Sequence, residues 1–158
     1  MTGPEPAPRI DTGESPRNVL FACNLNAIRS PMAAAIANHL FGHRLHAESV
    51  GVRAGGLSPF AVAAMAEIGI DLTGHTPRSF DDLEDAAFDL VVSLTPEAQH
   101  RAVELTRDMD CRLEYWPTFD PTAVDGSRET ILDAFRGVRD SLMAGIEARF
   151  RDLPPPTV

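Results

Sequence analysis

The chain has 158 residues, 44% of them apolar, which is enough for one domain with its own hydrophobic core. Its net charge of −9 at pH 7 argues against nucleic acid as a partner, because phosphate-backbone binding relies on clustered lysine and arginine. No apolar run approaches the roughly 18 residues that span a bilayer, and two cysteines give no disulfide framework. These features favour a cytoplasmic protein with no membrane partner.

The ends of the chain differ from its centre. Residues 1–16 are rich in proline and acid and have no apolar stretch, so we expect a flexible tail and no secretory signal there. A second proline-rich tail is expected at 153–158. Residues 17–152 are therefore predicted to form a single domain.

Within this domain, apolar runs alternate with helical patterns. Strands are predicted at residues 17–22, 45–50, 88–94 and 111–116. Helices are predicted at 31–40, 58–69, 79–82 (a short one), from 95 onward, and from about 127 to 150. Ser58-Pro59 and Thr95-Pro96 are helix starts, Gly69 can close the second helix, and Ser79 with Asp82 offers a capping box. This alternation predicts an α/β fold with a four-stranded parallel sheet and helices on both faces.

The signals around the first helix are specific. Ser30 is placed to cap the helix and Pro31 suits its first position, while Gly42 can take the left-handed conformation that ends a helix. His39, His43 and His46 follow closely and could suggest a metal site. Gly42 breaks their helical phase, and no cysteine or carboxylate completes a tetrahedral set, so we favour solvated histidines and predict no metal.

The first strand runs directly into a loop that ends at this helix. The positive end of the helix and its unpaired N–H groups face the loop, which favours a nucleophilic thiolate at Cys23. Arg29 lies six positions further on and can hold two oxygens of a tetrahedral oxyanion. Cys-x5-Arg alone is a weak motif, but here it lies between a strand and a helix start. The residues predicted to bind the anion are Asn24, Leu25, Asn26, Ala27, Ile28, Arg29 and Ser30.

From about residue 18 to 150 the chain resembles the low-molecular-weight protein tyrosine phosphatases, a family that includes thioredoxin-coupled arsenate reductases. The segments that carry the resemblance are Cys23-x5-Arg29-Ser30-Pro31-Met32-Ala33, Ser49-Val50-Gly51, Gly69-Ile70-Asp71-Leu72-Thr73-Gly74-His75, Phe88-Asp89-Leu90-Val91-Val92 and Phe119-Asp120-Pro121. The resemblance implies a strand order of 2-1-3-4, which places the Cys23 loop where the order reverses and ligands bind.

The resemblance also implies a mechanism that needs no metal and no cofactor. Cys23 would attack phosphorus in line and form a cysteinyl-phosphate, while Arg29 stabilises the charge on the oxygens. Asp120, beside Pro121, would act as general acid and then as general base, although Asp-Pro is also an ordinary turn signal. Asn26, Ser30, Ser49 and His75 match positions that support the loop through hydrogen bonds.

The sequence departs from the family at several places. Leu25 stands where glycine is usual, which raises the question of whether the backbone can form the same anion nest. Ile28 replaces a frequent second cysteine, so a protective disulfide with Cys23 is not expected. Residues 53–57 and 122–123 lack the aromatic side chains that wall a phosphotyrosine pocket, and Ala27 favours neither phosphotyrosine nor phosphoarginine.

Three functions follow from these residues. The first is a cysteine-dependent phosphomonoesterase acting on phosphotyrosine proteins or on small phosphomonoesters, in a site that also accepts phosphate, sulfate or arsenate. The second is an arsenate reductase that uses an external thiol, because Cys111 is the single further cysteine and cannot complete a relay alone. The third is a degenerate relative that binds phosphorylated partners without hydrolysis.

Overall fold

A four-stranded parallel sheet forms the centre of the computed structural model, which describes residues 16–83 and 87–151. Its strands are β1 (Asn18–Cys23), β2 (His46–Gly51), β3 (Leu90–Ser93) and β4 (Arg112–Tyr115). The order β2-β1-β3-β4 confirms the predicted topology. The expected tails, 1–16 apart from Pro16 and 153–158, lie outside the described residues.

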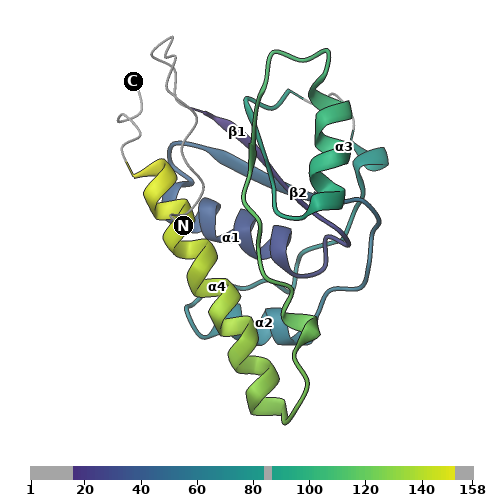
Figure 1. The fold of residues 1–158 in the computed structure, drawn as a ribbon. Coiled ribbons are helices and arrows are strands. Elements are labelled where there is room, and N and C mark those ends of the chain that lie inside the picture. Colours follow the sequence, from purple (N-terminus) through teal and green to yellow (C-terminus); the bar gives the residue numbers. More distant parts are fainter. Residues whose placement is uncertain (1–15, 84–86, 152–158) are drawn as a thin grey trace.

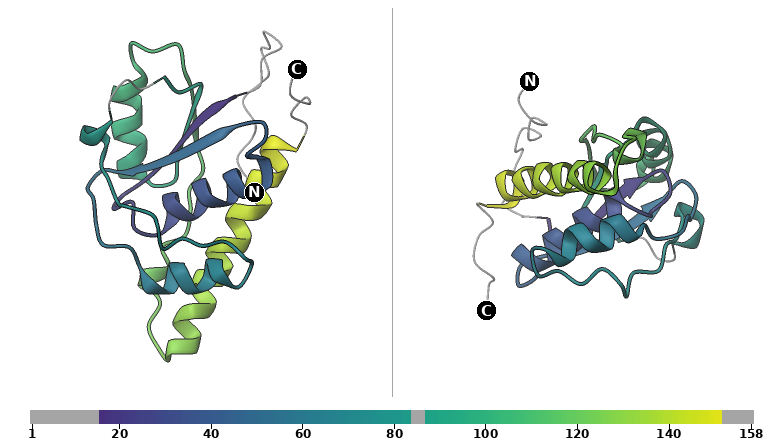
Figure 2. Two further views of the ribbon diagram at one scale, coloured as in Figure 1. Left: turned by 180° about the vertical axis from the view of Figure 1, so that it is seen from behind. Right: turned by 90° about the horizontal axis from the view of Figure 1, so that it is seen from below.

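Helices cover both faces of the sheet, as the sequence predicts (Figure 1). They are α1 (Arg29–Phe41), α2 (Pro59–Ala66), α3 (Pro96–Thr106) and α4 (Arg128–Phe150), with the 3-10 turns η1 (Phe80–Asp82) and η2 (Pro121–Ala123). The helices α1, α2 and α4 pack on one face, and α3 with η1 packs on the other, an arrangement that Figure 2 shows from behind and from below. No helix in the described ranges is long and apolar enough to cross a membrane.

The central strand β1 divides the apolar core in two. Val19 and Phe21 pack under α1 and α4. The rings of Phe21 and Trp116 pack edge-to-face there, with their centroids 6.0 Å apart. Leu20 and Ala22 point to the opposite face and pack under α3. Because β1 is buried on both faces, the loop that follows it starts from a fixed position. The predicted apolar stripe of α4 is buried too, at Phe135, Val138, Leu142, Ile146 and Phe150.

Charged side chains join α2 to α4. Glu67 at the end of α2 accepts hydrogen bonds from Arg136 and from Arg139 Nη1 at 2.8 Å, and Arg139 also donates to Ala64 O at 2.9 Å. The hydrogen bonds from Arg136 and Arg139 lower the pKa of Glu67 to about 2. These bonds join the end of α2 to α4.

Most predicted helix signals are confirmed. Ser58, Thr95 and Ser127 cap α2, α3 and α4, Ser79 forms the predicted capping box with Asp82, and Gly69 has a φ of +79° after α2.

Two signals around α1 were wrong. Ser30 does not cap α1: the helix begins at Arg29 with no side-chain cap, because the Ser30 hydroxyl turns toward Cys23. Gly42 has a right-handed φ of −60°, and it is required for space, since a Cβ there would lie 2.3 Å from Asn38 O.

Candidate active site

Cys23 is the last residue of β1, and its thiol contacts Ser30 in the first turn of α1. Its Sγ lies 2.9 Å from Ser30 Oγ and accepts a hydrogen bond from Ser30 N at 3.4 Å. The residue is only 2% exposed. Ser30 Oγ also lies 3.1 Å from Val50 O, so its one proton can point to that oxygen or to the sulfur, and in the second position it can stabilise a thiolate leaving group.

Asn26 gives the loop its shape. Its φ of 54° is the single positive φ at a non-glycine position among the described residues. The side chain donates to Ser30 Oγ at 2.9 Å and accepts from Arg78 N at 2.9 Å, while the backbone oxygen lies 2.9 Å from His75 Nε2. The left-handed residue of the nest is therefore Asn26, and Leu25 needs no glycine-like backbone.

Gly51 lets the end of β2 lie directly against this loop. A Cβ at Gly51 would come within 2.6 Å of Asn26 N and 2.4 Å of Arg53 O, so no other residue fits without a backbone shift. Beyond it the chain runs beside the loop, with Val52 N donating to Cys23 O at 3.0 Å and Arg53 N to Asn24 O at 2.9 Å. Sequence reasoning gave Gly51 no role, although a glycine between a buried strand and a loop is a signal of close approach.

The guanidinium of Arg29 faces the segment that carries Asp120. Arg29 Nη1 donates to Thr118 O at 3.0 Å, two residues before Asp120. The Asp120 carboxylate accepts from Thr122 N at 3.0 Å and from Thr122 Oγ1 at 2.6 Å. Partial burial acts to raise the pKa of Asp120, but the Thr122 bonds and the Arg29 charge outweigh it and hold the pKa below its ordinary value. The structure thus brings together Cys23, Arg29 and Asp120 at one edge of the sheet.

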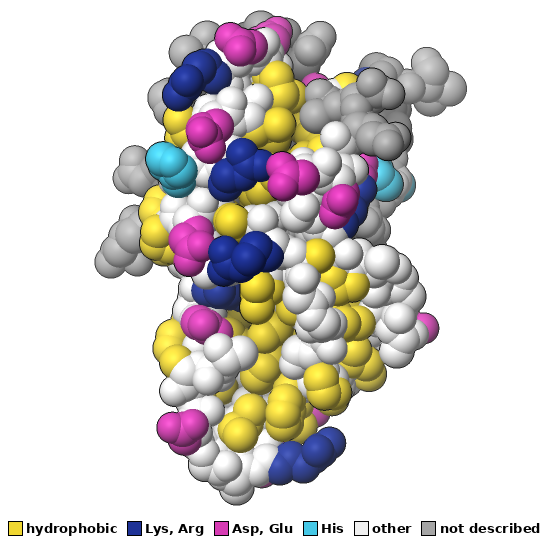
Figure 3. Space-filling model, turned by 90° about the vertical axis from the view of Figure 1, so that its right-hand side faces the viewer, with side chains coloured by type: hydrophobic (Ala, Val, Ile, Leu, Met, Phe, Trp, Pro, Cys, Tyr) yellow, Lys and Arg dark blue, Asp and Glu magenta, His cyan; other side chains and the backbone are white. Residues whose placement is uncertain are grey.

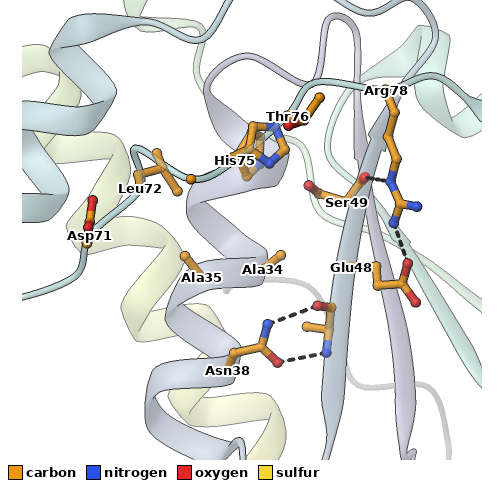
Figure 4. A pocket seen from close by; sticks show the side chains of 13 residues that line it. Ala34, Ala35, Asn38, Glu48, Ser49, Asp71, Leu72, His75, Thr76 and Arg78 are labelled. Atoms are coloured by element: carbon orange, nitrogen blue, oxygen red, sulfur yellow. Dashed lines mark hydrogen bonds and ion pairs between the residues drawn. The ribbon is translucent and has the colours of Figure 1, made fainter.

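The loop is supported from behind by residues around a pocket of about 310 Å³ between α1, β2 and residues 71–78 (Figure 4). His75 and Arg78 reach the loop from this side through the bonds to Asn26. Ser49 contributes through its backbone oxygen, which accepts from Arg78 Nε at 3.2 Å, and Arg78 also pairs with Glu48. Sequence reasoning missed Arg78, which lies 52 residues from Asn26 and belongs to no motif.

A second set of contacts holds the outer side of the loop. Thr95 Oγ1 donates to Asn24 Oδ1 at 2.6 Å while it also caps α3. Asn24 Nδ2 lies 3.5 Å from Glu97 Oε1, and Glu97 Oε2 lies 3.6 Å from Arg53 Nη1. The sequence shows Thr95 and Glu97 only as a helix start, so their contact with the loop was not predicted.

The other cysteine lies at the opposite edge of the sheet. The register pairs Val19 with Leu90 and Leu90 with Arg112. Cys111 is therefore level with Asn18, which lies five residues before Cys23 in β1. At about 3.3 Å per residue, the two thiols are roughly 16 Å apart along the strands alone. Burial, followed by the charges of Asp89 and Asp110, raises the pKa of Cys111 to about 11. Cys111 cannot form a disulfide with Cys23 in this fold.

The rim of the site is apolar on one side and charged on the other. Leu25 is 43% exposed and Phe119 is 59% exposed, both next to residues of the site. Figure 3 views the right-hand side of the molecule as drawn in Figure 1: hydrophobic side chains gather on the lower half of this face, and arginine and carboxylate side chains are denser on the upper half. The site can therefore receive an anion from a surface that is itself amphipathic.

Comparison with known proteins agrees with this geometry. The family model described as "Low molecular weight phosphotyrosine protein phosphatase" matches residues 18–153. Arsenate reductase 1 of Staphylococcus epidermidis is 31% identical over 83% of this chain and 93% of its own length, and the arsenate reductase of Bacillus subtilis is 34% identical over 78% and 88%.

Two similar solved structures are named as an arsenate reductase and as a protein tyrosine phosphatase. "An arsenate reductase in the phosphate binding state" has a TM-score of 0.67, 26% identity, and coverage of 87% of this chain and 99% of its own. The low-molecular-weight protein tyrosine phosphatase from T. tengcongensis has a TM-score of 0.70, 25% identity and the same coverage. The chain therefore belongs to the low-molecular-weight phosphotyrosine protein phosphatase family.

Proposed function

We propose that this protein is an arsenate reductase that completes its reaction with an external thiol. The observation that carries the proposal is the Cys23 sulfur, buried in an oxyanion loop and roughly 16 Å along the strands from the only other cysteine of the chain. The arsenate reductases at 31–34% identity favour arsenate over a phosphate ester as the substrate. This reverses the order of the sequence-based expectations, which placed the phosphomonoesterase first.

The first step uses the loop and Arg29. Arsenate is held by the N–H groups of the loop, and Arg29 exchanges its bond to Thr118 O for the oxygens of the anion. The Cys23 sulfur attacks arsenic, an S–As bond forms, and the opposite As–O bond breaks. The departing oxygen is the hydroxyl of arsenate, and Asp120 gives it the one proton with which it leaves as water. A bound dianion next to Asp120 raises its pKa and so counteracts the hydrogen bonds that lower it in the free protein.

The second step brings in the external thiol. Because Cys23 is 2% exposed and packed against Ser30, the accessible part of the adduct is the arsenic. A thiolate attacks arsenic where the oxygen left, and Cys23 departs as a thiolate, assisted by the Ser30 hydroxyl. A second thiolate then attacks the sulfur of the thiol–arsenic adduct. The electron pair of that S–As bond passes to arsenic, which leaves as arsenite, and the two thiols become a disulfide.

Phosphate ester hydrolysis is a second candidate, favoured by Asp120 beside Pro121 at the rim. It shares the first displacement, now on phosphorus, and differs in the second nucleophile, which is water. The half-exposed Leu25 and Phe119 could contact an aryl group, whereas residues 53–57 have no aromatic side chain. The identity of the second nucleophile therefore separates the two activities.

The test supplies both substrates to one preparation of the full chain. With arsenate and glutathione we expect one arsenite and one glutathione disulfide per turnover, and a lower kcat/KM for an aryl phosphate than for arsenate. Hydrolysis of the aryl phosphate without arsenite, with several thiols tried, would replace the proposal by the second candidate. Tight binding of a phosphopeptide with neither reaction would identify a binding protein.

A further inference from the structure

We propose that Arg53 recognises a carboxylate on the thiol co-substrate, and that this carboxylate replaces Glu97 as the ion-pair partner of Arg53. The inference rests on the proposed function, since it assigns the chemical class of the external thiol. That class is a small thiol that carries a carboxylate, such as a cysteine-containing peptide.

The position of Arg53 is fixed by its backbone. Arg53 N donates to Asn24 O at 2.9 Å, so the residue lies beside the first loop position after the nucleophile. Its guanidinium reaches toward α3, where Nη1 lies 3.6 Å from Glu97 Oε2. Glu97 Oε1 in turn lies 3.5 Å from Asn24 Nδ2. Arg53 follows β2, Asn24 follows β1 and Glu97 follows β3, so the pair crosses the outer rim of the oxyanion loop.

The Arg53–Glu97 pair is weak enough to open. The side chains are 62% and 54% exposed, and the closest N–O distance is 3.6 Å, so the pair contributes little to stability. A carboxylate from the co-substrate can form two parallel hydrogen bonds with a guanidinium, a stronger arrangement than the single long contact seen here. An incoming carboxylate can therefore take the place of Glu97 at Arg53.

Two other arginines near the site already have partners, which leaves Arg53 to bind the carboxylate. Arg29 is committed to the oxyanion, and Arg78 pairs with Glu48 behind the loop. The chain carries a net charge of −9, which on average repels a small anionic thiol, so an exposed cation at the site raises the local concentration of that thiol. At the rim, Arg53 supplies the positive charge that draws the thiol toward the apical position of arsenic.

The test compares 3-mercaptopropionate with its uncharged amide as thiol donors in arsenate reduction. Because both thiols undergo the same reaction, a mutation that slows the reaction itself lowers both kcat/KM values equally and leaves their ratio unchanged. We expect Arg53→Gln to lower the ratio about fivefold and Glu97→Gln to raise it. The matched control, Arg107→Gln, removes the same charge at the far end of α3 and leaves the ratio unchanged. Equal ratios in the Arg53 and Arg107 variants would overturn the inference while arsenate reduction itself stands.

A second measurement is independent of the reaction. On a Cys111→Ser background, the rates at which iodoacetate and iodoacetamide alkylate Cys23 report the charge at the rim. We expect their ratio to fall with Arg53→Gln, rise with Glu97→Gln and stay constant with Arg107→Gln. Absence of arsenite with every thiol defeats the proposed function, and with it the thiol assignment. An alkylation ratio that Arg53→Gln leaves unchanged removes Arg53 from the rim in either case.

Discussion

Two loops meet at the carboxyl edge of the sheet, and they are built in opposite ways. Between the last residue of β1 and the first turn of α1, Cys23, Asn26 and Ser30 are buried and bonded to one another and to distant segments. In the segment after β4, Phe119 and Asp120 are exposed, and among the described residues the side chain of Asp120 is hydrogen-bonded only to Thr122, two residues away. The proposed oxyanion site is therefore held by many contacts, whereas Asp120, the proposed proton donor, is exposed and held by a local turn. Anion binding and proton transfer should respond separately to mutation.

The largest effect is expected from Gly51→Ala, which disturbs the packing of β2 against the loop after β1. The added Cβ would lie within 2.4–2.7 Å of three backbone atoms, so the loop or β2 must shift. We expect the free energy of unfolding to fall by about 3 kcal/mol and arsenate binding to be lost. Chemical denaturation and isothermal calorimetry measure the two effects. Gly56→Ala is the matched control, because its Cβ would meet no atom within 4 Å. Equal behaviour of the two variants would contradict a tightly packed loop.

Asp120→Asn tests the segment after β4. We expect the first displacement to slow about 10²- to 10³-fold, because the departing oxygen loses its proton donor, while arsenate binding changes little. Rapid-quench kinetics separates the step from binding. Asp125→Asn, an exposed carboxylate of the same region, should behave as the unmodified protein. A loss of binding that matches the loss of rate would show that the two loops are not separable.

Thr122→Val tests whether the Thr122 hydroxyl lowers the pKa of Asp120. Burial raises this pKa, and the Thr122 bonds together with the Arg29 charge lower it further than burial raises it. Removing the hydroxyl therefore raises the pKa, and the acid stays protonated to higher pH. We expect the alkaline limb of the pH profile of kcat/KM to move to higher pH. Thr122→Ser keeps the hydroxyl and should leave the limb in place; a shift to lower pH in the valine variant would refute this role.

The smallest effect is expected from Glu67→Gln, which acts on the contact between α2 and α4. The pKa of Glu67 is lowered from 4.5 to about 2, so its contribution to stability is present above pH 4.5 and is lost as the pH falls toward 2. The melting temperature of the variant should be lower at neutral pH and should converge with that of the unmodified protein in acid. Arsenate reduction should not change. Glu104→Gln removes an exposed pair with Arg101 and serves as control; an equal drop would deny any special role to Glu67.

The sequence predicted the fold better than it predicted the contacts of the site. Strand order, helix positions and the caps at Ser79 and Thr95 followed from local patterns, because burial and capping leave signals within a few residues. Contacts between distant segments leave no such pattern: Arg78 and Asn26 are 52 residues apart, and Thr95 and Asn24 are 71 apart. Ser30 was misread as a cap because the capping pattern and the actual bond to Cys23 use the same hydroxyl.

One measurement tests the central claim, that Cys23 is the only thiol of the chain that the reaction uses. Arsenite production with glutathione is followed for Cys23→Ser and, side by side, for Cys111→Ser. Loss of turnover in the first variant and full turnover in the second is the result predicted by a single nucleophile that depends on an external thiol. Turnover that survives Cys23→Ser, or that disappears with Cys111→Ser, would contradict it.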